Sequence, residues 1–353
     1  MRIIRRISAL IIGIVFFISG LLKLMDPVGT GLIVESYLAF FKLGFLTSAT
    51  SVLAYLIALC ETICGAALLT GVARKLTAIF ALVMLSGFTV VTVVLFIANP
   101  EMDCGCFGEA IHLTHAQSLL KNIVLLLFWL LAFIPLSRQE RTRKIKFASF
   151  ALVVVSVLLF GLYTSLSIPP VEFTNYKPGT ELFLPEEVGI DEQKTAATLS
   201  LAGADGQYYD SLAVTGKVMV VSSYKPSAVS RKRWEKIADF VETAGKAGYL
   251  PVVALASAPY EMEQMAVPSE LMSYVYFADR KDLVTLNRSN GGVSYIADGQ
   301  IVSKWSVHAL PKQDELSAIF SQNPTEVLVE ENNAPRLRLQ AFLLYVFAIM
   351  LLL

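Results

Sequence analysis

Six long apolar runs constrain this chain more than any other feature, because about 20 mostly apolar residues suffice to cross a bilayer as a helix. Five runs come early in the chain, and a shorter sixth run lies at its end. They are residues 7–25, 48–70, 76–98, 116–136, 147–168 and 339–353. Charged residues make up 16% of the chain, whereas soluble proteins carry about 25%. The sequence therefore predicts an α-helical multi-pass protein in a lipid bilayer.

Basic residues gather in every second short loop, and this pattern predicts the orientation. They are Arg2, Arg5, Arg6, Arg74, Lys75, Arg138, Arg141, Arg143, Lys144 and Lys146. Cytoplasmic loops are the ones enriched in Lys and Arg. We therefore expect an inner (cytoplasmic) membrane protein with a cytoplasmic N-terminus and with residues 169–335 in the periplasm. The first run is too long for a signal-peptide core of about 7–15 residues, so we expect it to be a retained signal anchor.

Composition divides the chain into five expected segments. They are a transmembrane bundle at 1–136, a basic cytoplasmic loop with a fifth transmembrane helix at 137–168, a linker at 169–195 rich in Pro, Gly and Glu, an α/β domain at 196–322, and a C-terminal membrane helix at 336–353. Within the bundle, residues 28–45 carry apolar side chains at helical spacing. This segment is expected to form an amphipathic helix that either lies on the outer leaflet or packs on the bundle.

The α/β domain shows an ordered alternation of strand and helix patterns. The expected strands are 198–202, 217–222, 250–255 and 269–277, the expected helices are 230–244 and 312–320, and a hairpin is expected from 292–296 and 301–305. Strand–helix–strand followed by a hairpin and a helix is an order typical of thioredoxin-like domains.

The sharpest local motif is Asp103-Cys104-Gly105-Cys106-Phe107-Gly108, in a short loop expected to face outward. Gly between the two thiols provides backbone freedom, and a strained, exposed disulfide exchanges readily. Three interpretations remain open. The pair is redox-active, or it is a static disulfide that fixes the loop, or it binds a metal together with His112 and His115, although the spacing matches no standard zinc motif.

Three further candidates lie within the second apolar run. Cys60 and Cys64 share one helical face and either relay electrons to the loop cysteines or are simply small apolar core residues. Glu61 is a functional candidate because ionisable groups inside a membrane are costly. Lys23 is its potential partner, but Lys23 lies near the outer end of its run and Glu61 several turns deeper, so direct pairing is not expected. Lys23 alone could extend to the interface.

Several of these residues resemble known families. Ser19-Gly20-Leu21-Leu22-Lys23 and Glu61-x-x-x-Gly65-x-x-Leu68-Leu69-x-Gly71 resemble the DoxX pattern. The cysteine motif and Leu119-Leu120-Lys121-Asn122 resemble MauE, the methylamine-utilisation membrane protein. The similarity covers residues 3–135. It implies a four-helix redox-associated membrane bundle that handles disulfides of periplasmic proteins, with a membrane quinone as the potential electron acceptor.

The outer domain resembles the thioredoxin-like C-terminal region of some DoxX proteins, with one departure. After the strand at 218–222, where thioredoxins place Cys-x-x-Cys, this chain has Tyr224-Lys225-Pro226-Ser227, and Gly291 holds the usual cis-proline position. Without a thiolate there is no nucleophile for disulfide exchange. This domain is therefore expected to be redox-inert and to bind a partner.

Together these patterns predict a membrane thiol oxidoreductase that works through Cys104 and Cys106 on an extracytoplasmic protein. The alternatives are a non-enzymatic scaffold whose outer domain binds an envelope protein, and a metal-handling membrane protein. The chain has 29 basic and 29 acidic residues, and we expect no nucleic-acid partner.

Overall fold

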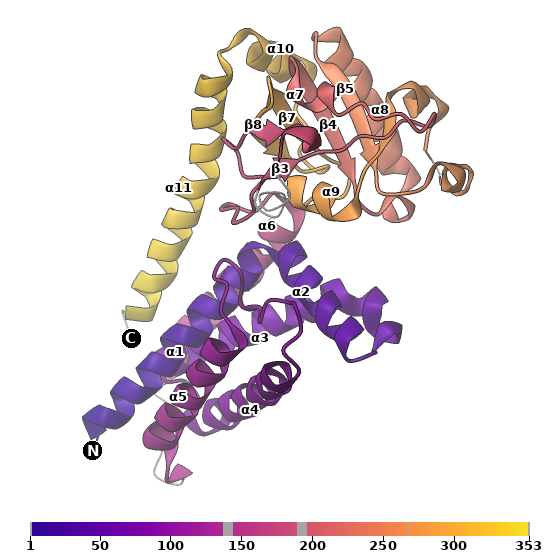
Figure 1. The fold of residues 1–353 in the computed structure, drawn as a ribbon. Helices are drawn as coiled ribbons and strands as arrows, with labels where there is room; N and C mark the ends of the chain where they lie inside the picture. The colour runs from indigo at the N-terminus through magenta and orange to yellow at the C-terminus, as the bar shows by residue number, and fades with distance from the viewer. Residues whose placement is uncertain (1, 137–143, 189–195, 266, 352–353) are drawn as a thin grey trace. The chain divides into compact units, whose positions relative to one another are not determined.

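The computed structural model describes residues 2–136, 144–188, 196–265 and 267–351, and the chain folds into two compact units (Figure 1). We call Met1–Ser165 with Leu339–Leu353 the helical unit, and Leu166–Arg338 the sheet unit. The basic loop expected at 137–146 lies mostly outside the described residues, as does the end of the expected linker.

The helical unit contains five helices that are long and apolar enough to cross a membrane. Its elements are α1 (Arg2–Met25), α2 (Pro27–Phe40), the 3-10 helix η1 (Gly44–Ala49), α3 (Thr50–Thr70), α4 (Arg74–Ala98), β1 (Cys106–Glu109), α5 (His115–Phe133) and α6 (Lys144–Leu166). The candidate spans are Ile3–Met25, Gly44–Thr70, Arg74–Ala98, His115–Phe133 and Lys146–Leu166. The five early spans expected from the sequence are confirmed as helices, and the chain is a multi-pass membrane protein.

Glycines allow α1 and α3 to cross at close range. A Cβ atom on Gly65 would lie 2.3 Å from the backbone nitrogen of Phe17, and one on Gly20 would lie 2.4 Å from the backbone nitrogen of Thr62. Small residues at such crossings let helix backbones approach in a bilayer, where packing rather than the hydrophobic effect drives helix association. This crossing brings the polar residues of α1 and α3 within hydrogen-bonding distance.

The segment expected at 28–45 forms α2 and packs on the bundle. Asp26 caps the helix, since its carboxylate accepts a hydrogen bond of 2.8 Å from the Gly29 N–H, and Pro27 occupies the first helical position, which suits a residue without an N–H. Gly29, Thr30, Gly31 and Leu38 are buried, and α2 packs against α3. Of the two interpretations left open by the sequence, the structure has the packed helix.

The sheet unit is built on five strands in the order β6-β5-β4-β7-β8. These strands are β4 (Lys217–Ser223), β5 (Leu250–Leu255), β6 (Val275–Phe277), β7 (Gly292–Ala297) and β8 (Gln300–Trp305). β4, β5 and β6 are parallel, whereas β7 pairs antiparallel with both β4 and β8. Helices α7 (Ser211–Val214), α8 (Arg231–Lys246), α9 (Arg280–Leu286) and α10 (Gln313–Ser321) accompany the sheet.

Alternating side chains of β4 fill a hydrophobic core on each face of this sheet. Met219 and Val221 pack in one cluster with Trp234 of α8. Val218 and Val220 pack in the other, which also holds residues of α9. The period of two follows from the pleat of a strand. Because both faces of β4 are covered, the strand reads in the sequence as a continuous apolar run.

Two expected strands are wrong in part. Of 269–277, only β6 is a strand, because Ser269–Tyr274 forms the 3-10 helix η6 after Pro268 and buries Leu271. Of 198–202, only Thr198 lies in a strand: β3 is Ala197–Thr198, which pairs in parallel with β2 (Leu182–Phe183). Short apolar segments do not separate strand from other buried structure by pattern alone.

The expected linker is also wrong over its described part, because residues 169–188 belong to the sheet unit and form buried contacts within it. The Tyr176 hydroxyl donates to the Thr198 carbonyl at 2.7 Å, and the Leu182 N–H donates to the Gly299 carbonyl at 2.8 Å. Lys304 of β8 forms an ion pair of 2.5 Å with Glu172, and both side chains are buried. The Pro-rich composition therefore marks irregular but ordered structure.

The C-terminal helix is longer than expected. α11 runs from Pro324 to Leu351 with Pro335 inside it, whereas the sequence predicts a membrane helix only over 336–353. A proline within a helix removes one hydrogen bond but does not always end the helix. Leu339–Leu353 belongs to the helical unit, where Phe342 stacks on Phe160 of α6 with a centroid distance of 4.4 Å.

The close crossing gives a matched pair of glycine variants. We expect Gly65→Ala to lower the thermal unfolding midpoint of the purified protein in detergent, because its methyl group would displace the α1 backbone and overpacking costs about 1–3 kcal/mol. Gly87→Ala in α4, where a Cβ atom would meet nothing within 4 Å, should leave the midpoint unchanged or raise it. Equal effects of the two variants would contradict the proposed close crossing.

Candidate functional site

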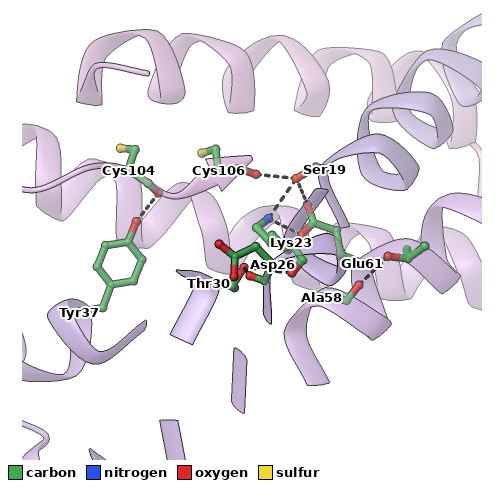
Figure 2. Close-up of polar contacts among 10 residues, drawn as sticks. Ser19, Lys23, Asp26, Thr30, Tyr37, Ala58, Glu61, Cys104 and Cys106 are labelled. Carbon is green, nitrogen blue, oxygen red and sulfur yellow. Dashed lines mark hydrogen bonds and ion pairs between the residues drawn. The ribbon is translucent and has the colours of Figure 1, made fainter. Parts of the chain in front are cut away.

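The loop between α4 and α5 presents the two thiols through a left-handed glycine. Gly105 has φ +56°, and a Cβ atom there would lie 2.4 Å from Cγ2 of Ile33 on α2. A side chain is therefore excluded both by backbone conformation and by space. Figure 2 shows the Cys104 and Cys106 side chains pointing to the same side of the loop, and both cysteines are free thiols.

Cys104 is the buried member of the pair, with 6% of its surface exposed. Its carbonyl accepts a hydrogen bond from the Tyr37 hydroxyl of α2, and its Sγ lies 3.1 Å from Nδ1 of His115. Burial raises the pKa of the Cys104 thiol, and the nearby Cys106 and Asp103 raise it further, while the nearby Ser118 hydroxyl and the charge of Lys121 lower it. Burial also raises the pKa of Tyr37, so its hydroxyl remains a donor.

Cys106 is partly exposed, and its backbone is held by α1. The Cys106 carbonyl accepts a hydrogen bond of 2.5 Å from the Ser19 hydroxyl. Together with the Tyr37 contact, this places the carbonyl of each loop cysteine on a donor from a different helix (Figure 2). The backbone of the pair is thereby fixed by hydrogen bonds that do not involve either sulfur.

A buried ion pair contacts the Ser19 hydroxyl that holds the Cys106 carbonyl. Lys23 Nζ lies 2.5 Å from Oε2 of Glu61, and the side chains are only 7% and 5% exposed. The Ser19 hydroxyl donates to Oε1 of Glu61 at 2.6 Å and lies 3.0 Å from Lys23 Nζ, which donates to it. The expectation that these two residues would not pair directly is wrong.

The reason is the unequal extent of the helices. Glu61 lies 11 residues beyond Thr50, the first residue of α3, which is about 16 Å at 1.5 Å per residue. α1 ends at Met25, and the chain then turns into α2, which packs against α3. α3 therefore extends past the end of α1, and Glu61 lies at the level of Lys23.

Ser19 connects this ion pair to the loop and has a single hydrogen to donate. Two acceptors, Oε1 of Glu61 and the carbonyl of Cys106, lie within 2.6 Å of its oxygen. The hydroxyl must share this hydrogen or alternate between the acceptors. A change in the charge of Glu61 would therefore alter the hydrogen bond that holds Cys106.

Cys60 and Cys64 belong to α3 and not to the loop that carries Cys104 and Cys106. Cys64 is buried among apolar residues of the bundle core, and Cys60 is exposed on α3. Among the described residues, no hydrogen bond joins either sulfur to Cys104 or Cys106. Electron relay through this pair therefore remains a prediction without a structural contact to support it.

The two loop histidines have different partners. His112 is exposed and pairs with Asp103 at 3.0 Å, whereas His115 contacts Cys104. Over the described part of the chain, no group of three or more His, Cys, Asp and Glu side chains is placed to hold a metal ion.

Sequence reasoning missed three roles. The sequence pattern suggested only a metal-binding role for His115, and it gave Tyr37 and Ser19 no part in the site. His115 follows Thr114, whose side chain forms a capping box with Gln117. That Thr-x-x-Gln signal places His115 in the first turn of α5 and could have fixed its position.

In the sheet unit, the segment after β4 is closed by Asn290. Its side chain accepts from the Lys225 N–H at 3.1 Å and donates to the Lys225 carbonyl at 2.8 Å. Gly291, with φ +87°, donates its N–H to the Ser222 carbonyl at 2.8 Å. Tyr224-Lys225-Pro226-Ser227 is thus an ordered turn without a thiol.

Residues 1–135 match the family described as methylamine utilisation protein MauE. A search of curated proteins found no match. The MauE-matching region contains all four cysteines together with Lys23 and Glu61, so the whole candidate site lies within it.

The buried ion pair generates a stability prediction. We expect Lys23→Met to lower the free energy of unfolding by about 3–5 kcal/mol, because it leaves an uncompensated carboxylate in the bundle. The double variant Lys23→Met, Glu61→Gln should recover part of this loss. Lys246→Met, which breaks the exposed pair with Glu242, serves as the control and should change nothing measurable. Thermal or denaturant unfolding in detergent tests this, and a double variant as unstable as Lys23→Met would contradict it.

Proposed function

We propose that this MauE-type membrane protein is a thiol–disulfide oxidoreductase that handles disulfides for extracytoplasmic proteins through Cys104 and Cys106. The observation that carries the proposal is the immobilised backbone of the pair. Tyr37 and Ser19 hold the two carbonyls, and Gly105 permits the tight connection between them. Such a site presents two free thiols on a preorganised support.

The reaction is an exchange of two electrons. In the oxidising direction, a partner dithiol becomes a disulfide while the Cys104–Cys106 disulfide becomes a dithiol, through a mixed disulfide between one loop sulfur and the partner. In the reducing direction the same steps run backwards. The proposal places the loop on the periplasmic side of the inner membrane, as the basic residues of the alternate loops indicate.

Reoxidation of the dithiol requires an acceptor for two electrons and two protons. A membrane quinone is the class that the family resemblance implies, and when bound it would leave as the quinol. Exposed apolar side chains flank the loop on both sides: Phe96 and Ile97 at the end of α4, and Ile111 before α5. These residues suit contact with an apolar acceptor that arrives from the bilayer.

The sheet unit fits a role in binding the partner. Its order of parallel β4–α8–β5, then the β7–β8 hairpin and α10, is the order expected of a thioredoxin-like domain. The turn after β4 has no cysteine and is closed by Asn290. We therefore propose a redox-inert, thioredoxin-like docking domain in a chain whose reactive thiols belong to the MauE-like region.

Thiol labelling in intact cells tests the proposal. After mild reduction, a membrane-impermeant maleimide should label Cys106 in a Cys60→Ser, Cys64→Ser background, because Cys106 is partly exposed in a periplasmic loop. Single loop variants should accumulate mixed disulfides that a reductant releases, and the Cys104→Ser, Cys106→Ser double variant should form none.

Full activity of the Cys104→Ser, Cys106→Ser double variant would instead favour a non-enzymatic scaffold. If the double variant retained the redox state of its envelope partners and full cellular activity, the thiols would be dispensable and the proposed reaction would be wrong. Labelling of Cys106 only in inverted vesicles would contradict the proposed orientation.

A further inference from the structure

The hydrogen bonds of His115 define its tautomer. Its Nε2 lies 3.1 Å from the carbonyl of Pro100, and a carbonyl can only accept. Nε2 therefore carries a hydrogen. In the neutral ring Nδ1 is then a bare acceptor, and this is the nitrogen that lies 3.1 Å from Sγ of Cys104.

This arrangement has the three parts of an activated nucleophile. A thiol contacts a base, and a third group orients the base. The Pro100 carbonyl orients the ring from one side, and the Thr114–Gln117 capping box fixes the helix turn that carries His115. After proton transfer, the Nδ1–H of the imidazolium would donate to the thiolate. The same contact is therefore a hydrogen bond both before and after the transfer.

The two cysteines differ in access. Cys104 is buried, whereas Cys106 is partly exposed. A protein partner therefore meets the sulfur of Cys106 first. The buried Cys104 lies two residues away, and its side chain points to the same side of the loop (Figure 2). Its sulfur is therefore placed to form or break a disulfide with Cys106.

Resting on the proposed function, we infer that His115 is the catalytic base of Cys104, and that Cys104 is the internal thiol that resolves mixed disulfides formed at Cys106. In the reducing direction, the Cys106 thiolate attacks a partner disulfide and one partner thiolate leaves. His115 then takes the Cys104 proton, the Cys104 sulfur bonds to the Cys106 sulfur, and the second partner thiolate leaves. Counting the proton that Cys106 gives to solvent when it ionises, the loop pair loses two electrons and two protons, and the partner disulfide gains two electrons and becomes two thiolates.

The electrostatic surroundings explain why a base is needed. Burial raises the pKa of Cys104, so the thiol does not ionise readily on its own. Of the charged and titratable groups that face it, Asp103 and Cys106 oppose ionisation, and Lys121 of α5 favours it. Tyr37 of α2 contacts the backbone and keeps its proton.

The test is the stoichiometric reaction of the reduced full-length protein, in detergent and in a Cys60→Ser, Cys64→Ser background, with dithiobis-nitrobenzoate. This aromatic disulfide releases one coloured thiolate when Cys106 attacks it and a second when Cys104 resolves the adduct. We expect His115→Ala to slow the second release by about 100-fold, the lower range of general-base effects, and to leave the first unchanged. The control is His112→Ala, which removes an exposed histidine from the same loop and should change neither phase.

A second variant distinguishes loss of the base from loss of structure. His115→Asn keeps a hydrogen-bond acceptor near the thiol but cannot take its proton, so it should fold with an unchanged unfolding midpoint and still show the slow second phase. The pH at which the second phase becomes fast should rise in both variants, since ionisation then depends on Cys104 alone.

The outcomes separate the two proposals. If His115 variants leave the second phase unchanged, or slow both phases equally, the assignment of His115 is wrong while the redox pair stands. If the parent protein with His115 intact releases no second thiolate, the pair does not close to a disulfide, and the proposed function fails together with this inference.

Discussion

The Lys23–Glu61 ion pair is the interaction on which the candidate site depends. Two charges inside an apolar bundle are stable only if they neutralise each other and fill their hydrogen bonds. α1 and α3 can bring them together because Gly20 and Gly65 allow the two backbones to touch. Ser19 extends the pair to the Cys106 carbonyl, so the loop that carries the thiols is attached to a buried ion pair of the bundle.

The sequence predicted the five early membrane helices and the main strands well, because those segments are long or strongly periodic. It failed where depth along a helix decided the contact. The apolar runs give no information on how far α3 extends past α1, so the pairing of Lys23 with Glu61 was missed. It also failed where composition suggested a linker, since Tyr176 and Glu172 make buried side-chain contacts within the sheet unit.

The chemistry of the site was predictable only in part. The Cys-Gly-Cys motif identified the thiols, and a left-handed Gly105 follows from it. The motif did not distinguish the two sulfurs, because their difference arises from burial and from His115, whose ring is placed by a helix cap. Position in the fold, rather than residue type, makes Cys104 the internal thiol and Cys106 the accessible one.

The two anchors of the loop have different physical characters. Tyr37 keeps its proton and holds Cys104 with a neutral hydroxyl. Ser19 divides one hydrogen between Cys106 and Glu61, so its hold on the loop depends on charge. A neutral side chain in place of Glu61 would compete less for that hydrogen and leave a stronger bond to Cys106. The accessible cysteine is thus the one whose backbone responds to the charge state of the bundle, while the cysteine paired with His115 is held independently of it.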